Sequence, residues 1–171
     1  MNISGGKYKG RKIYTPDERV TRPTLSKVRE GVFNSLYSLW GEFDGLSFFD
    51  VFGGSGIIGI EALSRGFSEV MTVEQNKKTG QILKKNYALF NETPELVVGN
   101  AISVLTKLDR KFDVAFVDPP YESGLYEEVI NRLLDIAEVI VVEHPTNLEL
   151  NIEGIKKQKK YGDKFISYIY K

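Results

Sequence analysis

One short run of residues has the composition of a site that acts on an amino group. Asp118, Pro119, Pro120 and Tyr121 directly follow the apolar residues 112–117. Two successive prolines stop a strand and forbid a helix, so they leave a stiff turn whose carbonyl groups have no strand partners. The amino group of a nucleic-acid base is a poor nucleophile, because its lone pair is delocalised into the ring. Asp118 and the Pro119 carbonyl could hold both amino protons and turn that lone pair toward a methyl group, while Tyr121 stacks on the base. The alternative is a surface turn that Asp118 caps.

A glycine-rich segment earlier in the chain has the spacing of a nucleotide-binding loop. Residues 54–59 spell G-x-G-x-x-G between an expected strand and an expected helix. Glycines permit a tight turn and let a ligand approach the bare backbone. Glu74 lies 20 residues after Gly54, at the end of the next expected strand, where its carboxylate could accept both hydrogen bonds of a ribose diol. This context predicts an adenosine-containing ligand, and the alternative is a structural turn with a surface glutamate. The predicted contacts are Phe52, Gly53, Gly54, Gly56, Gly59 and Glu74.

Two kinds of cofactor bind to a loop of this kind, a nicotinamide dinucleotide and S-adenosylmethionine. Asp50, just before the loop, helps to distinguish between them. A dinucleotide presents a pyrophosphate, which a carboxylate would repel. S-adenosylmethionine has no phosphate, and its positive sulfonium and ammonium groups favour a nearby acid. Asp50 therefore favours S-adenosylmethionine, unless its carboxylate only caps the loop amides. Asn100 and Ala101, after the third expected strand, are candidates for the adenine, although Asn100 also suits a helix N-cap.

Alternating strand and helix patterns position these residues. Each motif follows an apolar strand, and regular alternation of this kind predicts a Rossmann-like parallel sheet with helices on both faces and ligands beyond the carboxyl ends of its strands. A small hairpin over 2–14 and a helix from Thr24, its expected N-cap, precede the sheet. The final two strands, around 161–163, are expected to be antiparallel. The expected strands are 46–52, 69–74, 95–98, 112–117, 138–142, 154–160 and 164–170, and the expected helices of the sheet region are 57–65, 76–91, 101–108 and 125–135.

Length and composition exclude several other classes. The chain has 171 residues, of which 42% are hydrophobic, enough for one domain and too few for two of full size. Without cysteine and with His144 as its single histidine, it lacks the residues for a thiolate or histidine metal site, so we expect no metal. His144 is expected to be structural, or at the edge of the site, rather than a catalytic base. No apolar run approaches a membrane span, and we expect a cytoplasmic protein.

Charge is unevenly distributed along the chain. The formal net charge is zero, yet residues 1–40 hold eight basic and three acidic side chains, so the front carries +5 and the remainder −5. This polarity suits a local phosphate-binding surface on an otherwise neutral protein, although a merely solvated basic segment has the same composition. The candidate residues of such a surface are Lys7, Lys9, Arg11, Lys12 and Arg22.

The segments around these residues resemble the bacterial 16S rRNA guanine-N2 methyltransferases. Beyond the shared residues 118–121, residues 3–13, residues 22–34 and residues 61–66 look like blocks of that family, and the likeness runs from about residue 3 to 145. The resemblance implies a class I methyltransferase fold with a seven-stranded, mostly parallel sheet and an antiparallel C-terminal strand. It implies a single domain, 1–171, with a basic RNA-contacting extension over 1–23 and a Rossmann-like core over 24–171.

The same resemblance assigns roles to the candidate residues. It implies that S-adenosylmethionine is held by Asp50, the loop from Gly53 to Gly59, Glu74 and the Asn100–Ala101 pair, and that residues 118–121 position the amino group. The implied partner is 16S rRNA or a 30S assembly particle, docked by the basic hairpin. Two departures are Gly53, where the family usually has alanine and which should loosen the loop slightly, and Asn100, where it usually has aspartate.

Three alternatives remain open from the sequence. An amino-methyltransferase could act on DNA adenine, tRNA guanine or protein glutamine, since all share the tetrapeptide at 118–121. A nicotinamide-dependent dehydrogenase would need a substrate domain within the residues that already complete the sheet. A non-enzymatic RNA-binding module would not need Asp118 or Tyr121.

Overall fold

A seven-stranded sheet forms the centre of the computed structural model, which describes residues 1–16, 25–120 and 124–170. Its strand order is β3-β2-β1-β4-β5-β7-β6, and the five strands from β3 to β5 run parallel, while β7 is antiparallel to both of its neighbours. This confirms the predicted class I methyltransferase fold. The strands are β1 (Ser47–Asp50), β2 (Glu69–Glu74), β3 (Glu95–Val98), β4 (Phe112–Val117), β5 (Ala137–Pro145), β6 (Ile155–Tyr161) and β7 (Lys164–Ile169).

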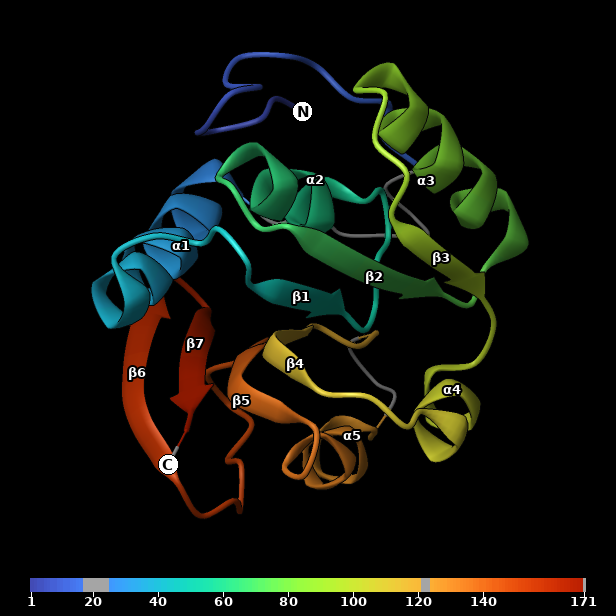
Figure 1. The fold of residues 1–171 in the computed structure, drawn as a ribbon. Helices are drawn as coiled ribbons and strands as arrows, with labels where there is room; N and C mark the ends of the chain where they lie inside the picture. The colour runs from blue at the N-terminus through green and yellow to red at the C-terminus, as the bar shows by residue number, and fades with distance from the viewer. Residues whose placement is uncertain (17–24, 121–123, 171) are drawn as a thin grey trace.

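Helices cover both faces of this sheet. In Figure 1, α1, α2 and α3 lie on one side of the strands, and α4 and α5 lie on the other. Each parallel connection passes through a helix, so successive strands point the same way and their carboxyl ends meet at one edge. None of the described helices is long and apolar enough to cross a membrane. The helices are α1 (Ser26–Trp40), α2 (Ile57–Ser64), α3 (Lys77–Leu89), α4 (Ala101–Lys107) and α5 (Tyr126–Leu133).

The hydrophobic core lies in two layers, one on each side of the sheet. Successive side chains of a strand point to opposite faces, so Phe48 packs toward α1, α2 and α3 while Phe49 packs toward α4 and α5. Both phenylalanines are fully buried. Because both faces are covered, β4, which is apolar at every position except Asp113, contributes side chains to both core layers.

Element boundaries follow the sequence expectations with a few corrections. Three strands, β2, β3 and β4, have the expected bounds. Helix α1 begins at Ser26 with Leu25 at its N-cap position, and no side chain caps it; Thr24 lies outside the described residues. In α3, apolar spacing predicts a buried side formed by Ile82, Leu83, Leu89 and Phe90, yet Leu89 is 39% exposed, whereas Asn86 and Tyr87 are buried. The last turn of α3 therefore presents a different face to the core from the one that apolar spacing indicated.

The N-terminal segment folds back on itself and packs against α2 and α3. A single antiparallel bridge joins Asn2 to Lys12, so the expected hairpin is a turn without regular strands. Ile3 and Ile13 are buried in the first core layer. The Tyr14 amide donates to the Asn86 side chain, which in turn donates to the Ser55 carbonyl in the glycine loop. The segment is thus linked to the loop that opens α2.

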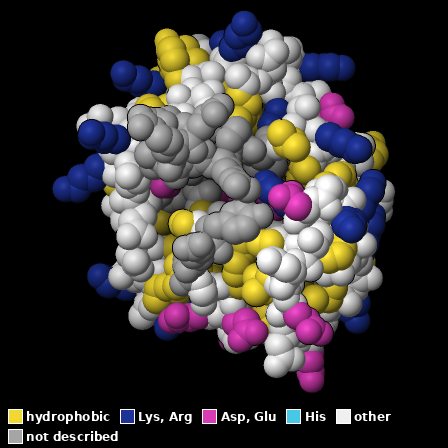
Figure 2. Space-filling view, turned by 180° about the vertical axis from the view of Figure 1, so that it is seen from behind, with side chains coloured by type: hydrophobic (Ala, Val, Ile, Leu, Met, Phe, Trp, Pro, Cys, Tyr) yellow, Lys and Arg dark blue, Asp and Glu magenta, His cyan; other side chains and the backbone are white. Residues whose placement is uncertain are grey.

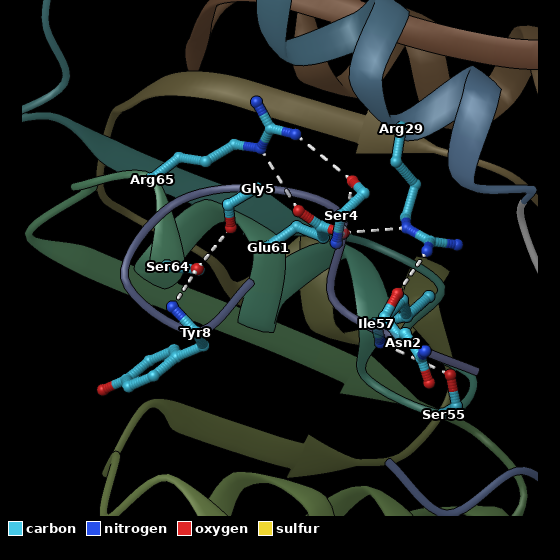
Figure 3. A network of polar contacts seen from close by, with 10 residues as sticks. All are labelled: Asn2, Ser4, Gly5, Tyr8, Arg29, Ser55, Ile57, Glu61, Ser64 and Arg65. Atoms are coloured by element: carbon cyan, nitrogen blue, oxygen red, sulfur yellow. Dashed lines mark hydrogen bonds and ion pairs between the residues drawn. The ribbon is translucent and has the colours of Figure 1, made fainter. Parts of the chain in front are cut away.

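Glu61 connects the N-terminal segment to two helices. Its side chain on α2 is fully buried and accepts hydrogen bonds from the Ser4 backbone amide and hydroxyl, from Arg29 at 3.0 Å and from Arg65 at 3.2 Å. Figure 3 shows these side chains converging on Glu61 between the N-terminal turn and α1. Arg29 also donates to the Asn2 carbonyl at 2.6 Å. One carboxylate therefore fixes three segments that are far apart in the sequence.

Replacing Glu61 should destabilise the fold strongly. Glu61→Ala leaves the buried Arg29 guanidinium without its carboxylate, which costs about 3–5 kcal/mol of unfolding free energy. Denaturant unfolding monitored by circular dichroism measures this change. The matched control is Glu128→Ala, which breaks the exposed Glu128–Arg132 pair on α5 and should cost about 1 kcal/mol or less. Equal losses for the two variants would show that the Glu61 network does not hold the N-terminal segment.

Candidate active site

Asp50 lies at the carboxyl end of β1, in the middle of the sheet. Its backbone is paired with Thr72 of β2 and Phe116 of β4. Asp50 is 1% exposed, and among the residues that the structure describes neither of its carboxylate oxygens has a hydrogen-bond partner. A buried acid without a partner is costly, so a native protein keeps one where a ligand completes its bonding. Of the loop amides, only that of Phe52 lies close enough to Asp50 to affect its pKa, and it makes no hydrogen bond of ordinary geometry with the carboxylate.

Burial and a neighbouring acid keep Asp50 protonated near neutral pH. Desolvation raises its pKa to about 8, and the negative charge of Glu74 adds to the rise, while the nearby Phe52 amide lowers it slightly. A cation that approached this carboxyl group would reverse the desolvation effect and favour the ionised form. Asp50 therefore fits a positively charged group of a ligand and does not fit a phosphate.

The glycine loop turns directly after Asp50 and opens α2. The Gly53 amide donates to the Val73 carbonyl at 2.7 Å, and the Gly56 amide donates to the Gly53 carbonyl at 2.9 Å. Gly56 has a φ of 89° and forms the N-cap of α2 in a left-handed conformation. A side chain there would also be strained sterically, because a Cβ atom would lie 2.5 Å from Leu83.

The loop glycines differ in how much space surrounds the position of a Cβ atom. At Gly59 a Cβ atom would lie 1.9 Å from the Tyr87 hydroxyl, and at Gly53 it would lie 2.3 Å from the Thr72 side chain. These two glycines are required by packing against α3 and β2. Around Gly54 there is open space, so its bare backbone is the part of the loop that a ligand can approach. The expectation that Gly53 loosens the loop is not supported by this close packing, since a methyl group would not fit beside Thr72.

Glu74 lies at the end of β2, next to the glycine loop. Its side chain is partly buried, and desolvation raises its pKa. The backbone amides of Asn76, Gly54 and Gln75 offset this rise by hydrogen bonding to the carboxylate. The bond from Gly54 joins the Glu74 carboxylate to the exposed part of the loop. The predicted ribose diol would lie beside this carboxylate.

Asn100 and Ala101 lie at the start of α4, after β3. The Asn100 side-chain oxygen accepts from the Ser103 amide at 3.1 Å, so Asn100 is the N-cap of the helix. This confirms the N-cap alternative that the sequence left open. One lone pair of that oxygen is therefore occupied, and the proposed contact with adenine depends on the other. Ala101 is buried as the first residue of the helix.

Asp118 and Pro119 lie at the carboxyl end of β4, beside Asp50. Val117 pairs with Val142 of β5, and the chain leaves the sheet at Asp118. Asp118 is partly exposed, Pro119 is buried and Pro120 is exposed. Desolvation and the neighbouring Glu143 carboxylate raise the pKa of Asp118 well above its ordinary value, and Asp50 adds to the rise. Tyr121 lies outside the described residues.

Glu143 and Lys164 belong to this group of residues and were not predicted from the sequence. Glu143, on β5, is 1% exposed and accepts a hydrogen bond from the Lys164 ammonium of β7 at 2.9 Å. The one signal in the sequence was an acid inside an apolar strand.

His144, the residue after Glu143, bonds Ser167 at 2.8 Å and the Pro145 carbonyl at 3.2 Å, and burial lowers the pKa of its ring. These bonds agree with the expected structural role of His144.

Two of the candidate RNA-binding residues, Lys7 and Arg11, make contacts within the protein. The Lys7 ammonium lies 3.4 Å from Glu92, and Arg11 donates to the Leu89 carbonyl and lies over the Phe90 ring. Both side chains therefore help to hold the N-terminal turn near the C-terminal end of α3. Lys9 and Lys12 are exposed, and Arg22 lies outside the described residues. Figure 2, which views the side opposite to Figure 1, shows basic side chains along most of the margin and acidic ones gathered at its lower edge.

A separate groove lies at the opposite, amino-terminal edge of the sheet. It has a volume of about 900 Å³ and is lined by residues such as Lys111, Phe112, Ala137 and Lys156. None of the predicted site residues lines it, so the groove is not the ligand site that the sequence predicts. Within the described ranges, no group of three acidic or histidine side chains is arranged to hold a metal ion.

Comparisons with known proteins relate this arrangement to one family. Residues 1–170 match the family model described as conserved hypothetical protein 95. The Escherichia coli protein named ribosomal RNA small subunit methyltransferase D is 40% identical over 136 residues, which cover 79% of this chain and 67% of the relative.

Solved structures give the same relationship. A solved Escherichia coli chain is similar with a TM-score of 0.86 and 32% identity, covering 100% of this chain and 98% of the other. A solved Thermus thermophilus chain, described as a hypothetical protein, has a TM-score of 0.87 and 26% identity, covering 100% and 99% of the two chains. The chain therefore belongs to the family described as conserved hypothetical protein 95, the family of the bacterial small-subunit ribosomal RNA methyltransferases D.

Proposed function

We propose that this chain transfers a methyl group from S-adenosylmethionine to the exocyclic N2 amino group of a guanine in 16S ribosomal RNA. The observation that carries the proposal is the buried Asp50 carboxyl group, which has no partner and borders the open backbone at Gly54. Enzymes of this fold use S-adenosylmethionine, whose positive groups suit that carboxyl group. The guanine and the ribosomal RNA are inferred from the named relative that is 40% identical. Such a substrate would place the activity in the cytoplasm.

Some residues of the site would bind the methyl donor, and others would hold the amino group that accepts the methyl group. Asp50 would attract the positive end of the donor, Gly54 would offer its backbone, and Glu74 would accept the ribose hydroxyls. When bound, S-adenosylmethionine supplies an electrophilic methyl group. Asp118 and the Pro119 carbonyl would accept hydrogen bonds from the two amino protons and so direct the nitrogen lone pair toward the donor. Tyr121 remains the candidate for stacking on the guanine.

The direct test of this function is transfer of labelled methyl from S-adenosylmethionine. The substrates are 30S particles and naked 16S rRNA, both from cells that lack the protein, followed by nucleoside analysis. The expected product is labelled N2-methylguanosine. In the same assay Asp118→Ala should reduce turnover by about a hundredfold or more while retaining donor binding. Label in tRNA, DNA or protein, but not in 16S rRNA, would replace this proposal with another amino-methyltransferase activity.

The Asp50→Asn variant tests the proposed role of Asp50 in donor binding. Loss of the carboxylate should weaken the affinity for S-adenosylmethionine by about ten- to a hundredfold at pH 8, measured by calorimetry. Unchanged affinity would indicate that the carboxyl group has only a structural role.

The same variant should change how stability depends on pH. Without donor, the folded protein holds the Asp50 proton up to about pH 8, whereas the unfolded chain loses it near 3.8. The folded state binds more protons in that window, so the unfolding free energy falls as pH rises through it. Asp50→Asn should show a smaller fall between pH 5 and 8 than the parent chain. Equal falls would contradict the raised pKa.

The basic N-terminal turn can be tested for RNA contact with side chains that do not hold the fold. Lys9→Ala combined with Lys12→Ala should weaken RNA binding and reduce the slope of log affinity against log salt by up to about 2. The matched control is Lys111→Ala with Lys156→Ala, which removes the same charge from the opposite edge of the sheet. An equal effect of both double variants would indicate general charge attraction rather than a docking surface.

A further inference from the structure

Two carboxyl groups meet in the candidate site, where the parallel pairing of β4 with β5 ends. The parallel pairing of Val117 with Val142 brings the next residues, Asp118 and Glu143, side by side at the carboxyl edge of the sheet. Their carboxyl groups lie within hydrogen-bonding reach of each other. A hydrogen bond between two acids requires a proton, because two bare carboxylates in contact repel each other. The pair therefore holds one shared proton.

The surroundings of the pair decide which acid carries that proton. The Lys164 ammonium donates to Glu143 at 2.9 Å and stabilises it as a carboxylate. Asp118 lies beside the negative charge of Glu143, and burial raises its pKa further. His144 is bonded to Ser167 and the Pro145 carbonyl, and its lowered pKa keeps it neutral. Asp118 is thus the protonated member, and it donates its proton to Glu143.

The two acids differ in their access to a substrate. Asp118 is partly exposed at the end of β4, whereas Glu143 is 1% exposed and lies behind it. Lys164 is also largely covered, with 17% of its side chain exposed. A base held at the site would therefore touch Asp118 and not Glu143. Any effect of Glu143 on the reaction must act through Asp118.

We propose that Glu143 is a positioning residue that receives, through Asp118, the proton that the target amino group loses. This inference rests on the proposed methyltransferase function. The bond to Glu143 engages one carboxyl oxygen of Asp118 and so directs the other toward the amino group. The Lys164 ammonium stabilises Glu143 as a carboxylate, the form that can accept the proton.

The proton transfer balances within these residues. Methylation forms an N–C bond as the S–C bond of the donor breaks, and the amino nitrogen then carries one proton too many. The free oxygen of Asp118 takes that proton, while the other oxygen gives its own proton to Glu143. Asp118 ends as it began, as a neutral acid, and Glu143 becomes neutral. Water takes the proton from Glu143 after the product leaves.

Single-turnover kinetics of three variants test the relay in the methyl-transfer assay. Glu143→Gln keeps the shape of the side chain but removes the proton acceptor, so the rate should fall about tenfold or more, with little change in the KM for donor or RNA. Lys164→Gln removes the charge that stabilises the Glu143 carboxylate. Without that charge, the pH below which activity is lost should move up by about one unit. Lys164→Arg should restore the parent profile.

A purely structural role gives a different result. Glu143→Gln and Lys164→Gln would then lower the melting temperature, and the pH profile of the remaining activity would match that of the parent chain. That outcome would overturn the relay, as would a parent rate in folded Glu143→Gln.

Infrared spectroscopy tests the shared proton without any substrate. The difference spectrum between the parent chain and Asp118→Asn at pH 7 should contain the carbonyl band of a protonated carboxyl group. Asp50 is also protonated at that pH, but its band is common to both proteins and cancels. Absence of the band would overturn the inference even if the chain methylates rRNA. A chain that shows the band but methylates no RNA would instead contradict the proposed function alone.

Discussion

The parallel register of β1, β2, β4 and β5 is the constraint on which the rest of the site depends. It makes the parallel pairing of all four strands stop at one edge of the sheet, and an acidic residue lies at or just after each of these points: Asp50, Glu74, Asp118 and Glu143. Burying four carboxylates together would be very unfavourable. The structure offsets this cost differently at each position. Glu74 accepts backbone amides, Glu143 pairs with Lys164, and Asp50 and Asp118 have raised pKa values.

The N-terminal segment depends on a second buried acid. Glu61 lies on α2, one turn after the glycine loop, and holds Ser4 and Arg29 through hydrogen bonds. The loop itself is held by Asn86, which bonds both Ser55 and Tyr14. Movement of the first residues would therefore be transmitted to the backbone at which a donor is proposed to bind. This coupling gives a physical reason why the family likeness extends through the N-terminal residues.

The sequence predicted the strands and the glycine loop well because both depend on local patterns. The largely apolar run at 112–117 is typical of a buried strand, and a G-x-G-x-x-G motif is typical of the loop that follows a strand. Contacts between distant residues were not predictable in this way. Nothing near Glu143 in the sequence indicates Lys164, because the two meet only through the antiparallel pairing of β5 and β7. Likewise, the bond from Arg11 to the Leu89 carbonyl arises from packing against α3, which the charge pattern of the N-terminal residues does not indicate.

The protonation of these acids also indicates how the carboxyl edge of the sheet could bind both a negatively charged RNA and a positively charged donor. A polyanion such as RNA would be repelled by four carboxylates, whereas the donor carries positive groups that require at least one. With Asp50 and Asp118 neutral and Glu143 paired with Lys164, the edge has little net charge before the donor binds. A cation beside Asp50 would favour release of its proton, so the negative charge would form only where it is immediately neutralised. The raised pKa of a buried acid thus reduces repulsion of the nucleic acid while it retains a site for the donor.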